Sequence, residues 1–206
     1  MSNNKVPQLL LVTYLLLFVV LAIAPYDRAV WLVENIPVWV VVGLLVLTFK
    51  RFRFSNTAYF LMWFFLCYHT VGGHFTFELT PFAWGNHLLS IFNFDFVLPE
   101  GRNNFDRLGH FLVGVFSYPI VEVSLRKQWV KSKMIAFFLA VFALGFWAAS
   151  YEVVEMYYAV LEGGESGAAF LGSQGDVWDA QKDMLLDICG AVLFALLALF
   201  RNYRRS

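Results

Sequence analysis

Acidic and histidine side chains lie in or beside stretches of this chain that are otherwise apolar enough to cross a membrane. The carboxylates are Asp106, Glu152, Glu155, Asp183 and Asp187, and the imidazoles are His69, His74 and His110. A carboxylate at the centre of a membrane helix costs roughly 2.5–3.5 kcal/mol on insertion scales, and such residues usually mark functional sites. These eight residues therefore form the candidate site.

The pair Asp106 and His110 is separated by four positions, so both side chains project from one face of a helix. A carboxylate that accepts one imidazole N–H leaves the other nitrogen for proton transfer or for a metal. Asp106 could instead cap its helix or interact with the helix dipole. Capping by Asp106 would not explain His110, because His110 lies one helical turn further into the apolar stretch.

The pair Glu152 and Glu155 is separated by three positions and shares a helix face. Two carboxylates this close cannot both ionise cheaply in a medium of low dielectric constant. They require a proton, a cation or a basic partner. The alternative to a functional pair is a structural ion pair with Arg102, Arg107 or Lys182.

An acidic stripe begins the last apolar stretch, where Asp179, Asp183 and Asp187 follow one another at intervals of four. We expect Asp179 to be exposed or to cap the helix. Asp187 lies deepest, and Gly190 follows it closely. A glycine at this position permits close approach of another helix.

The histidines His69 and His74 flank Gly72 and Gly73, where we expect a helix to end or kink. They are either hydrogen-bonded residues at the membrane interface or ligands. Histidine combined with carboxylate favours Zn, Mn or Fe over an all-oxygen site. The predicted ligands of a divalent metal are His69, His74, His110 and Glu155.

The composition and the apolar stretches indicate which secondary-structure elements contain these residues. Sixty per cent of residues are hydrophobic, 15% are charged and the mean hydropathy is +0.64, all typical of a membrane protein. The apolar stretches are residues 8–24, 33–49, 56–71, 106–125, 134–158 and 182–200. We predict an all-α membrane protein, a bundle of six transmembrane helices in one domain spanning 1–206. The first stretch is interpreted as a retained helix, because Pro25 would poorly suit signal-peptide cleavage.

The orientation follows from the basic residues. With the N-terminus inside, eleven of fifteen fall on the inner side: Lys5, Lys50, Arg51, Arg53, Arg126, Lys127, Lys131, Lys133, Arg201, Arg204 and Arg205. Both termini are then inside. Glu122 is the single acidic residue on that side, and we expect it to pair with Arg126 four positions later. This topology places the candidate site residues at one depth, near the outer leaflet.

A formal net charge of zero argues against a nucleic-acid partner. The two cysteines, Cys67 and Cys189, lie in apolar stretches and predict no disulfide. The lipid bilayer is the expected partner, and the sequence does not indicate an oligomeric state.

Motifs in the C-terminal half resemble the VanZ-like series. They are Asp106-Arg-Leu-Gly-His-Phe111, a later helix with two glutamates, and Trp178-Asp-Ala-Gln-Lys-Asp-Met-Leu-Leu-Asp187. The following Asp187-Ile-Cys-Gly190 lacks the Asn of that series. VanZ-like proteins are associated with glycopeptide resistance and the cell envelope. A role of this chain in resistance would rest on similarity of fold alone.

Across its full length, the chain more closely resembles the YjdF-like family of uncharacterised bacterial inner-membrane proteins. The additional motifs are Ala24-Pro-Tyr-Asp-Arg28 and His69-x-x-Gly-Gly-His74. This resemblance implies a multi-pass protein of the inner membrane and implies no particular reaction.

Our first hypothesis is an enzyme that acts on a lipid or lipid-linked envelope substrate at the outer leaflet, by metal-dependent or acid–base chemistry. The alternatives are a non-enzymatic envelope-ligand binding protein and a proton- or cation-coupled transporter. The single level of the polar groups and the lack of an inverted repeat argue against transport.

Overall fold

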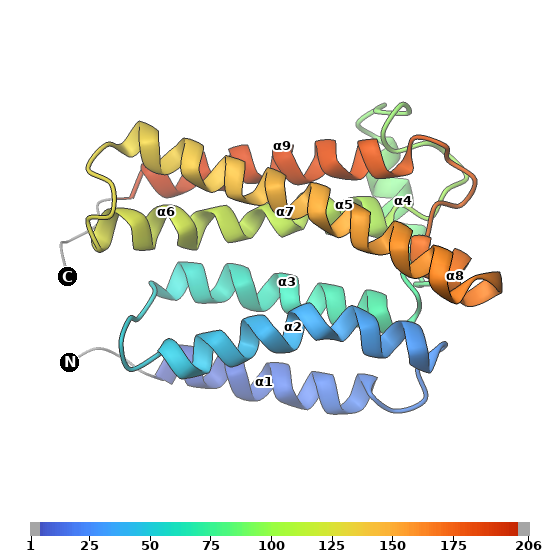
Figure 1. Ribbon diagram of the computed structural model, residues 1–206, viewed down its shortest axis with the longest axis horizontal. Helices are drawn as coiled ribbons and strands as arrows, with labels where there is room; N and C mark the ends of the chain where they lie inside the picture. The colour runs from blue at the N-terminus through green and yellow to red at the C-terminus, as the bar shows by residue number, and fades with distance from the viewer. Residues whose placement is uncertain (1–4, 202–206) are drawn as a thin grey trace. The chain divides into compact units, whose positions relative to one another are not determined.

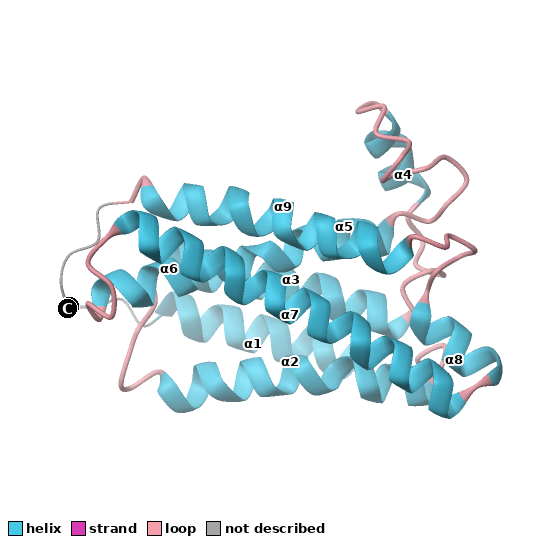
Figure 2. Cartoon of the chain, turned by 45° about the horizontal axis from the view of Figure 1, so that its top comes forward, coloured by secondary structure: helices cyan, strands magenta, loops and turns pink. Residues whose placement is uncertain are grey.

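The computed structural model describes residues 5–201, and this part of the chain is helical without any strand (Figures 1 and 2). The α-helices are α1 (Lys5–Leu21), α2 (Arg28–Thr48), α3 (Asn56–His74), α4 (Ala83–Ser90), α5 (Phe105–Val113), α6 (Ser117–Arg126), α7 (Lys133–Glu162), α8 (Gly164–Leu171) and α9 (Asp179–Leu199). A short 3-10 helix, η1 (Gly114–Phe116), joins α5 to α6. The all-helical prediction is confirmed. Arg204 and Arg205, which contributed to the predicted orientation, lie outside the described residues.

Three helical stretches of the described chain are long and apolar enough to cross a membrane. They are α2, the continuous stretch Phe105–Arg126 and α7, while α1 is apolar but shorter. Each of the six predicted spans coincides with helix, because α3 and α9 occupy the remaining two. The number of spans and their orientation remain predictions.

The chain divides into two compact units. The first comprises the residues up to Asp106 together with Tyr158–Gln174, and the second comprises Arg107–Tyr157 and the residues from Gly175 onward. The chain passes between the units three times, within α5, within α7 and in the loop between Gln174 and Gly175.

In the first unit, α3 packs beside both α1 and α2, and α8 packs on α2. The helix α2 begins after Asp27, whose carboxylate accepts the backbone N–H groups of Ala29 and Val30. Inside the unit, the hydroxyl oxygens of Tyr14 and Thr70 lie 3.2 Å apart and join α1 to α3. The first unit is thus a group of apolar helices that polar side chains also connect.

In the second unit, η1 and α6 pack against α9. The 3-10 turn has a local cause in Pro119, which has no N–H to donate to the Val115 carbonyl and whose ring would crowd that carbonyl. The predicted span 106–125 is therefore interrupted at Gly114–Phe116.

Close packing in the second unit depends on two glycines. A Cβ atom on Gly190 would overlap the carbonyl oxygen of Phe111, and one on Gly114 would overlap the backbone of Gly190. Beside them, the Ser117 hydroxyl donates to the Ala191 carbonyl at 2.9 Å. The contact sets the register between α5 and the first turns of α9, which run in the same direction.

Candidate functional site

A buried arginine organises the polar residues of the second unit. Arg107 lies on α5 and is fully buried. Its Nη1 is 2.5 Å from a carboxylate oxygen of Asp183, and its Nη2 is 2.7 Å from Asp179 and 3.0 Å from Asp176. Nη1 also donates to the backbone carbonyl of Asp179 at 3.0 Å. One guanidinium therefore binds three carboxylates at the start of α9, as its fork of N–H donors permits.

The position of Asp179 corrects a prediction. We expected this residue to be exposed or to cap the helix, but it is buried and accepts hydrogen bonds from Arg107. The reason lies in the register of α5 and α9, which brings the first turn of α9 onto the guanidinium. An isolated carboxylate at this place would be costly, and the ion pair offsets that cost.

A second cation lies at the edge of this group. The Lys182 ammonium donates to the Asp176 carboxylate at 2.7 Å. Arg107 and Lys182 thus face three aspartates, and Asp187 adds a fourth carboxyl group one helical turn beyond Asp183. Four carboxyl groups share two basic side chains, so the group favours a further proton or cation.

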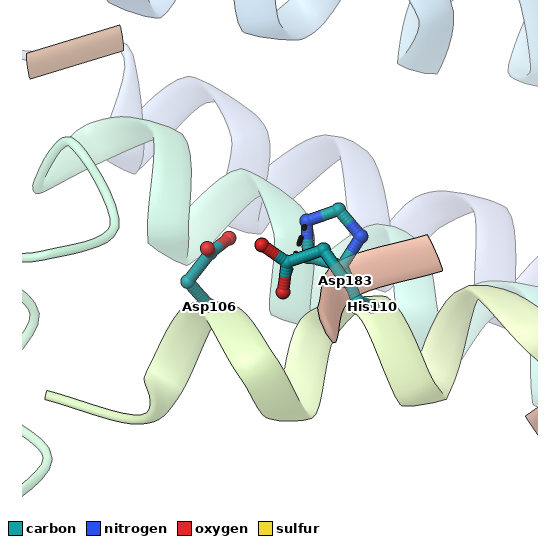
Figure 3. A group of neighbouring side chains, drawn as sticks. All are labelled: Asp106, His110 and Asp183. Atoms are coloured by element: carbon teal, nitrogen blue, oxygen red, sulfur yellow. Dashed lines mark ion pairs between the residues drawn. The ribbon is translucent and has the colours of Figure 1, made fainter. Parts of the chain in front are cut away.

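The imidazole of His110 lies between two of these aspartates. Its Nδ1 is 3.2 Å from the Asp187 carboxylate, and its Nε2 is 3.9 Å from Asp183. The His110 side chain is 14% exposed and both carboxylates are 3% exposed. Figure 3 shows His110 with Asp183 beside its ring and Asp106 on the preceding turn of α5.

This geometry links the protonation of the ring to that of Asp187. When Asp187 is ionised it can only accept, and the hydrogen bond at Nδ1 then requires a proton on that nitrogen. In neutral His110 the lone pair is then on Nε2. A carboxylate that holds one imidazole nitrogen in this way makes the other a stronger base or a better ligand. Asp106 offers an oxygen within 4.8 Å of a ring nitrogen, one turn earlier on the same helix.

The two glutamates of the predicted site lie on α7. Glu152 and Glu155 are each 9% exposed, so a membrane helix buries both carboxylates. Their burial agrees with the requirement for a proton, a cation or a basic partner. Their participation in chemistry remains a prediction.

The two remaining histidines lie in the first unit, where each contacts a backbone carbonyl. His69 Nε2 is 3.0 Å from the Glu34 carbonyl oxygen and 3.4 Å from the Glu34 carboxylate. His74 Nδ1 is 2.8 Å from the Leu21 carbonyl, and α3 ends at this residue, as predicted. These contacts fit hydrogen-bonded histidines, which was one of the two interpretations of the sequence.

Sequence reasoning missed Arg107 and Glu34 as central polar residues. Arg107 is three positions before His110, so the same helix-face argument that selected Asp106 applies to it. Glu34 is buried within α2 and lies next to the fully buried Asn35. Two adjacent polar residues in an apolar stretch were the available signal. Elsewhere, the predicted pair of Glu122 and Arg126 is confirmed, at 2.7 Å.

The carboxylate of Asp176, in the loop before α9, should make the stability of the folded protein depend on pH. The hydrogen bond from Lys182, with smaller contributions from Trp178 N–H and Arg107, lowers the pKa of Asp176 from its ordinary value of 3.8. A lowered pKa stabilises the fold above the ordinary value, and this contribution is lost as the pH falls through the folded-state pKa. We expect the stability difference between wild type and Asp176→Asn to be constant above about pH 5 and to shrink below 3.8.

Unfolding of both proteins in detergent, followed at pH values from about 3 to 7, measures this difference. A difference that does not change across that range would contradict the role of Asp176.

Comparisons with known proteins place the chain in a family. Residues 6–204 match the family model described as "Predicted membrane protein (DUF2238)". The chain is also 34% identical over 182 residues to a protein named inner membrane protein YjdF, from Escherichia coli (strain K12). This match covers 87% of the chain and 82% of that protein. No solved structure matches the chain significantly. The chain belongs to the DUF2238 family of membrane proteins.

Proposed function

We propose that this member of the DUF2238 family is an inner-membrane enzyme that acts on a lipid or lipid-linked substrate of the cell envelope, with His110 as its acid–base group. The observation that carries the proposal is the hydrogen bond between His110 Nδ1 and Asp187, at 3.2 Å. It holds the ring in one orientation and places the basic nitrogen beside Asp183.

In this mechanism, Nε2 of His110 accepts a proton from a hydroxyl group or a water molecule and later returns it to the leaving group. Asp187 stabilises the imidazolium that forms, and Asp183 adds a second negative charge 3.9 Å from the ring. Arg107 holds Asp183 in place. General acid–base catalysis of this kind contributes roughly 10²–10⁴-fold in rate.

The predicted topology supports a substrate from the envelope. Six spans with both termini inside would place the first turns of α5 and α9 at the outer leaflet, beside lipid head groups. The distribution of basic residues supports this orientation. The name of the Escherichia coli relative supports an inner-membrane location.

A divalent metal is the second candidate. Asp106, His110 and Asp183 supply carboxylate and imidazole ligands, and each aspartate has an oxygen within 4.8 Å of a ring nitrogen of His110. Such a mixed set suits Zn, Mn or Fe. The ligand set predicted from the sequence, His69, His74, His110 and Glu155, stays a prediction.

Substitution of His110 tests both candidates. The protein, reconstituted in vesicles of total polar lipids from a Gram-negative bacterium, is assayed for altered lipids by mass spectrometry and for bound metal by elemental analysis. We expect His110→Gln to lower turnover by about 100-fold or more. His87→Gln is the control, because His87 is exposed on the short helix α4.

The possible results distinguish between a metal site, acid–base catalysis and transport. Stoichiometric metal that is lost in His110→Gln but kept in His87→Gln supports the metal site. Unaltered lipids together with proton flux into the vesicles would favour transport. If His110→Gln turns over lipid as fast as wild type, the acid–base proposal is wrong.

A further inference from the structure

The first unit contains an apolar cavity that is separate from the histidine–aspartate site. The cavity measures about 190 Å³ and lies among the first half of α1, the second half of α2 and the first half of α3. Most of its lining is aliphatic, including Leu10, Leu11, Val42, Leu45 and Leu66. The lining residue Val46 is 51% exposed, so the cavity reaches the surface of the helices.

Size and polarity indicate what the cavity can hold. An apolar cavity of about 150 Å³ in a protein interior stays dry and binds benzene. This cavity is larger and has mostly apolar walls, with Gln8 and the polar ends of Tyr14, Tyr59 and Trp63 among its lining residues, so it suits a hydrocarbon group more than water. In a membrane, the abundant hydrocarbon group is the acyl chain of a lipid.

The two ends of the cavity differ in chemistry. Beyond Tyr14, aromatic rings join α1 to α2: Phe18 lies 5.5 Å from Trp31 and 6.2 Å from Trp39 between ring centroids. At the other end, α1 begins with Lys5, and Lys50 follows α2 directly after the lining residue Phe49. The cavity therefore has basic residues beyond one end and aromatic rings beyond the other.

The charged residues that lie closest in the sequence to the cavity-lining parts of α1, α2 and α3 are all basic. Lys5, Lys50, Arg51 and Arg53 are exposed, and the Arg53 guanidinium lies 5.0 Å from the centre of the Phe49 ring. Residues 1–26 and 35–77 contain neither aspartate nor glutamate. Lys5, Lys50 and Arg51 thus flank one end of an apolar cavity, an arrangement complementary to an anionic head group.

One buried donor in the lining also points to a ligand. The indole N–H of Trp63 is buried and has no hydrogen-bond acceptor among the residues that the structure describes. A buried donor without an acceptor is costly. An ester carbonyl oxygen of a lipid chain in the cavity would supply the acceptor.

We propose that the first unit binds one anionic phospholipid, with an acyl chain in the cavity and the phosphate against Lys50 and Arg51. The site is independent of the proposed enzyme activity, because every residue that forms it belongs to the first unit. Each basic residue near an anionic lipid contributes about 1 kcal/mol, or about fivefold in affinity.

Native mass spectrometry of the full chain tests the proposal. The protein is released from nanodiscs of phosphatidylglycerol or phosphatidylcholine, and the fraction that carries one lipid is measured. Wild type is expected to retain phosphatidylglycerol preferentially. Leu45→Trp fills the cavity and should lower retention of both lipids at least fivefold. Leu47→Trp is the matched control, because Leu47 lies two positions away, is 78% exposed and does not line the cavity.

A second set of variants tests the basic residues. Lys50→Gln is combined with Arg51→Gln, and Lys127→Gln combined with Lys131→Gln is the control pair. The first pair should lower phosphatidylglycerol retention about 25-fold and leave phosphatidylcholine unchanged, at about fivefold for each charge. Val42→Phe is a second cavity-filling variant if Leu45→Trp aggregates. Equal retention by the cavity-filling variants and Leu47→Trp, or no preference of wild type for the anionic lipid, overturns the proposal. Turnover at His110 is expected to be unchanged in Leu45→Trp.

Discussion

Replacing Arg107 with methionine is expected to lower the free energy of unfolding by about 3–5 kcal/mol, the range measured when one partner of a buried ion pair is removed. The guanidinium is fully buried and binds Asp176, Asp179 and Asp183. Methionine fills similar space but removes the cation that binds Asp179 and Asp183, while Asp176 keeps its contact with Lys182. Unfolding in mixed detergent micelles, followed by tryptophan fluorescence, measures the change.

Two further variants identify the cause of that loss. Arg107→Lys keeps the charge but not the fork of donors, so it should fall between wild type and Arg107→Met. Adding Asp179→Asn and Asp183→Asn to Arg107→Met should recover part of the stability, because fewer buried charges then lack a partner. The exposed Lys131→Met is the control for loss of a cation. If Arg107→Met is as stable as Lys131→Met, the ion-pair network does not support the fold.

Replacing Gly190 with alanine is expected to lower the free energy of unfolding by about 1–3 kcal/mol, the usual cost of overpacking. The new Cβ would overlap the carbonyl oxygen of Phe111, which is backbone and cannot rotate away. Helices α5 and α9 would have to separate. The same unfolding assay in micelles measures the change.

A second glycine provides the matched control for Gly190→Ala. Gly43 lies inside α2, and a Cβ there would meet nothing within 4 Å. Alanine favours a helix over glycine by about 0.8–1.0 kcal/mol, so Gly43→Ala should be neutral or stabilising. Equal effects of Gly43→Ala and Gly190→Ala would show that the close approach of α5 and α9 is not required.

These two predictions also separate stability from chemistry at the site. Arg107 and Gly190 position His110 and its aspartates without being the proposed proton-transfer group. Their replacement should act first on unfolding, whereas His110→Gln should act first on turnover. A variant of His110 that is as stable as wild type but inactive would therefore be the strongest support for the proposed function.

The positions of the helices were largely predictable from the sequence. Each apolar stretch became helix because a membrane segment must satisfy its own backbone hydrogen bonds. The pairing of Glu122 with Arg126 was also predictable, since it depends only on helical spacing. The break at Gly114–Phe116 was not predicted, although Pro119 was a local signal for it.

The candidate site was predictable only in part. Spacing placed Asp106 and His110 on one face of a helix, and Asp179, Asp183 and Asp187 on one face of another. It did not show which aspartate would meet the histidine, nor that Arg107 would bind Asp176, Asp179 and Asp183. Asp179 was expected to be exposed or to cap the helix, and its burial against Arg107 depends on the register of α5 and α9.

The sequence by itself determined that this is a helical membrane protein and that its polar residues concentrate at the start of α5 and α9. Both follow from local properties, namely hydropathy and the periodicity of a helix. The tertiary structure decided that Asp187 orients His110 and that Arg107 holds Asp183. Those contacts depend on the register between two helices about seventy residues apart in the chain. That register is set by the Gly114 and Gly190 backbones, whose close approach is a property of packing in three dimensions.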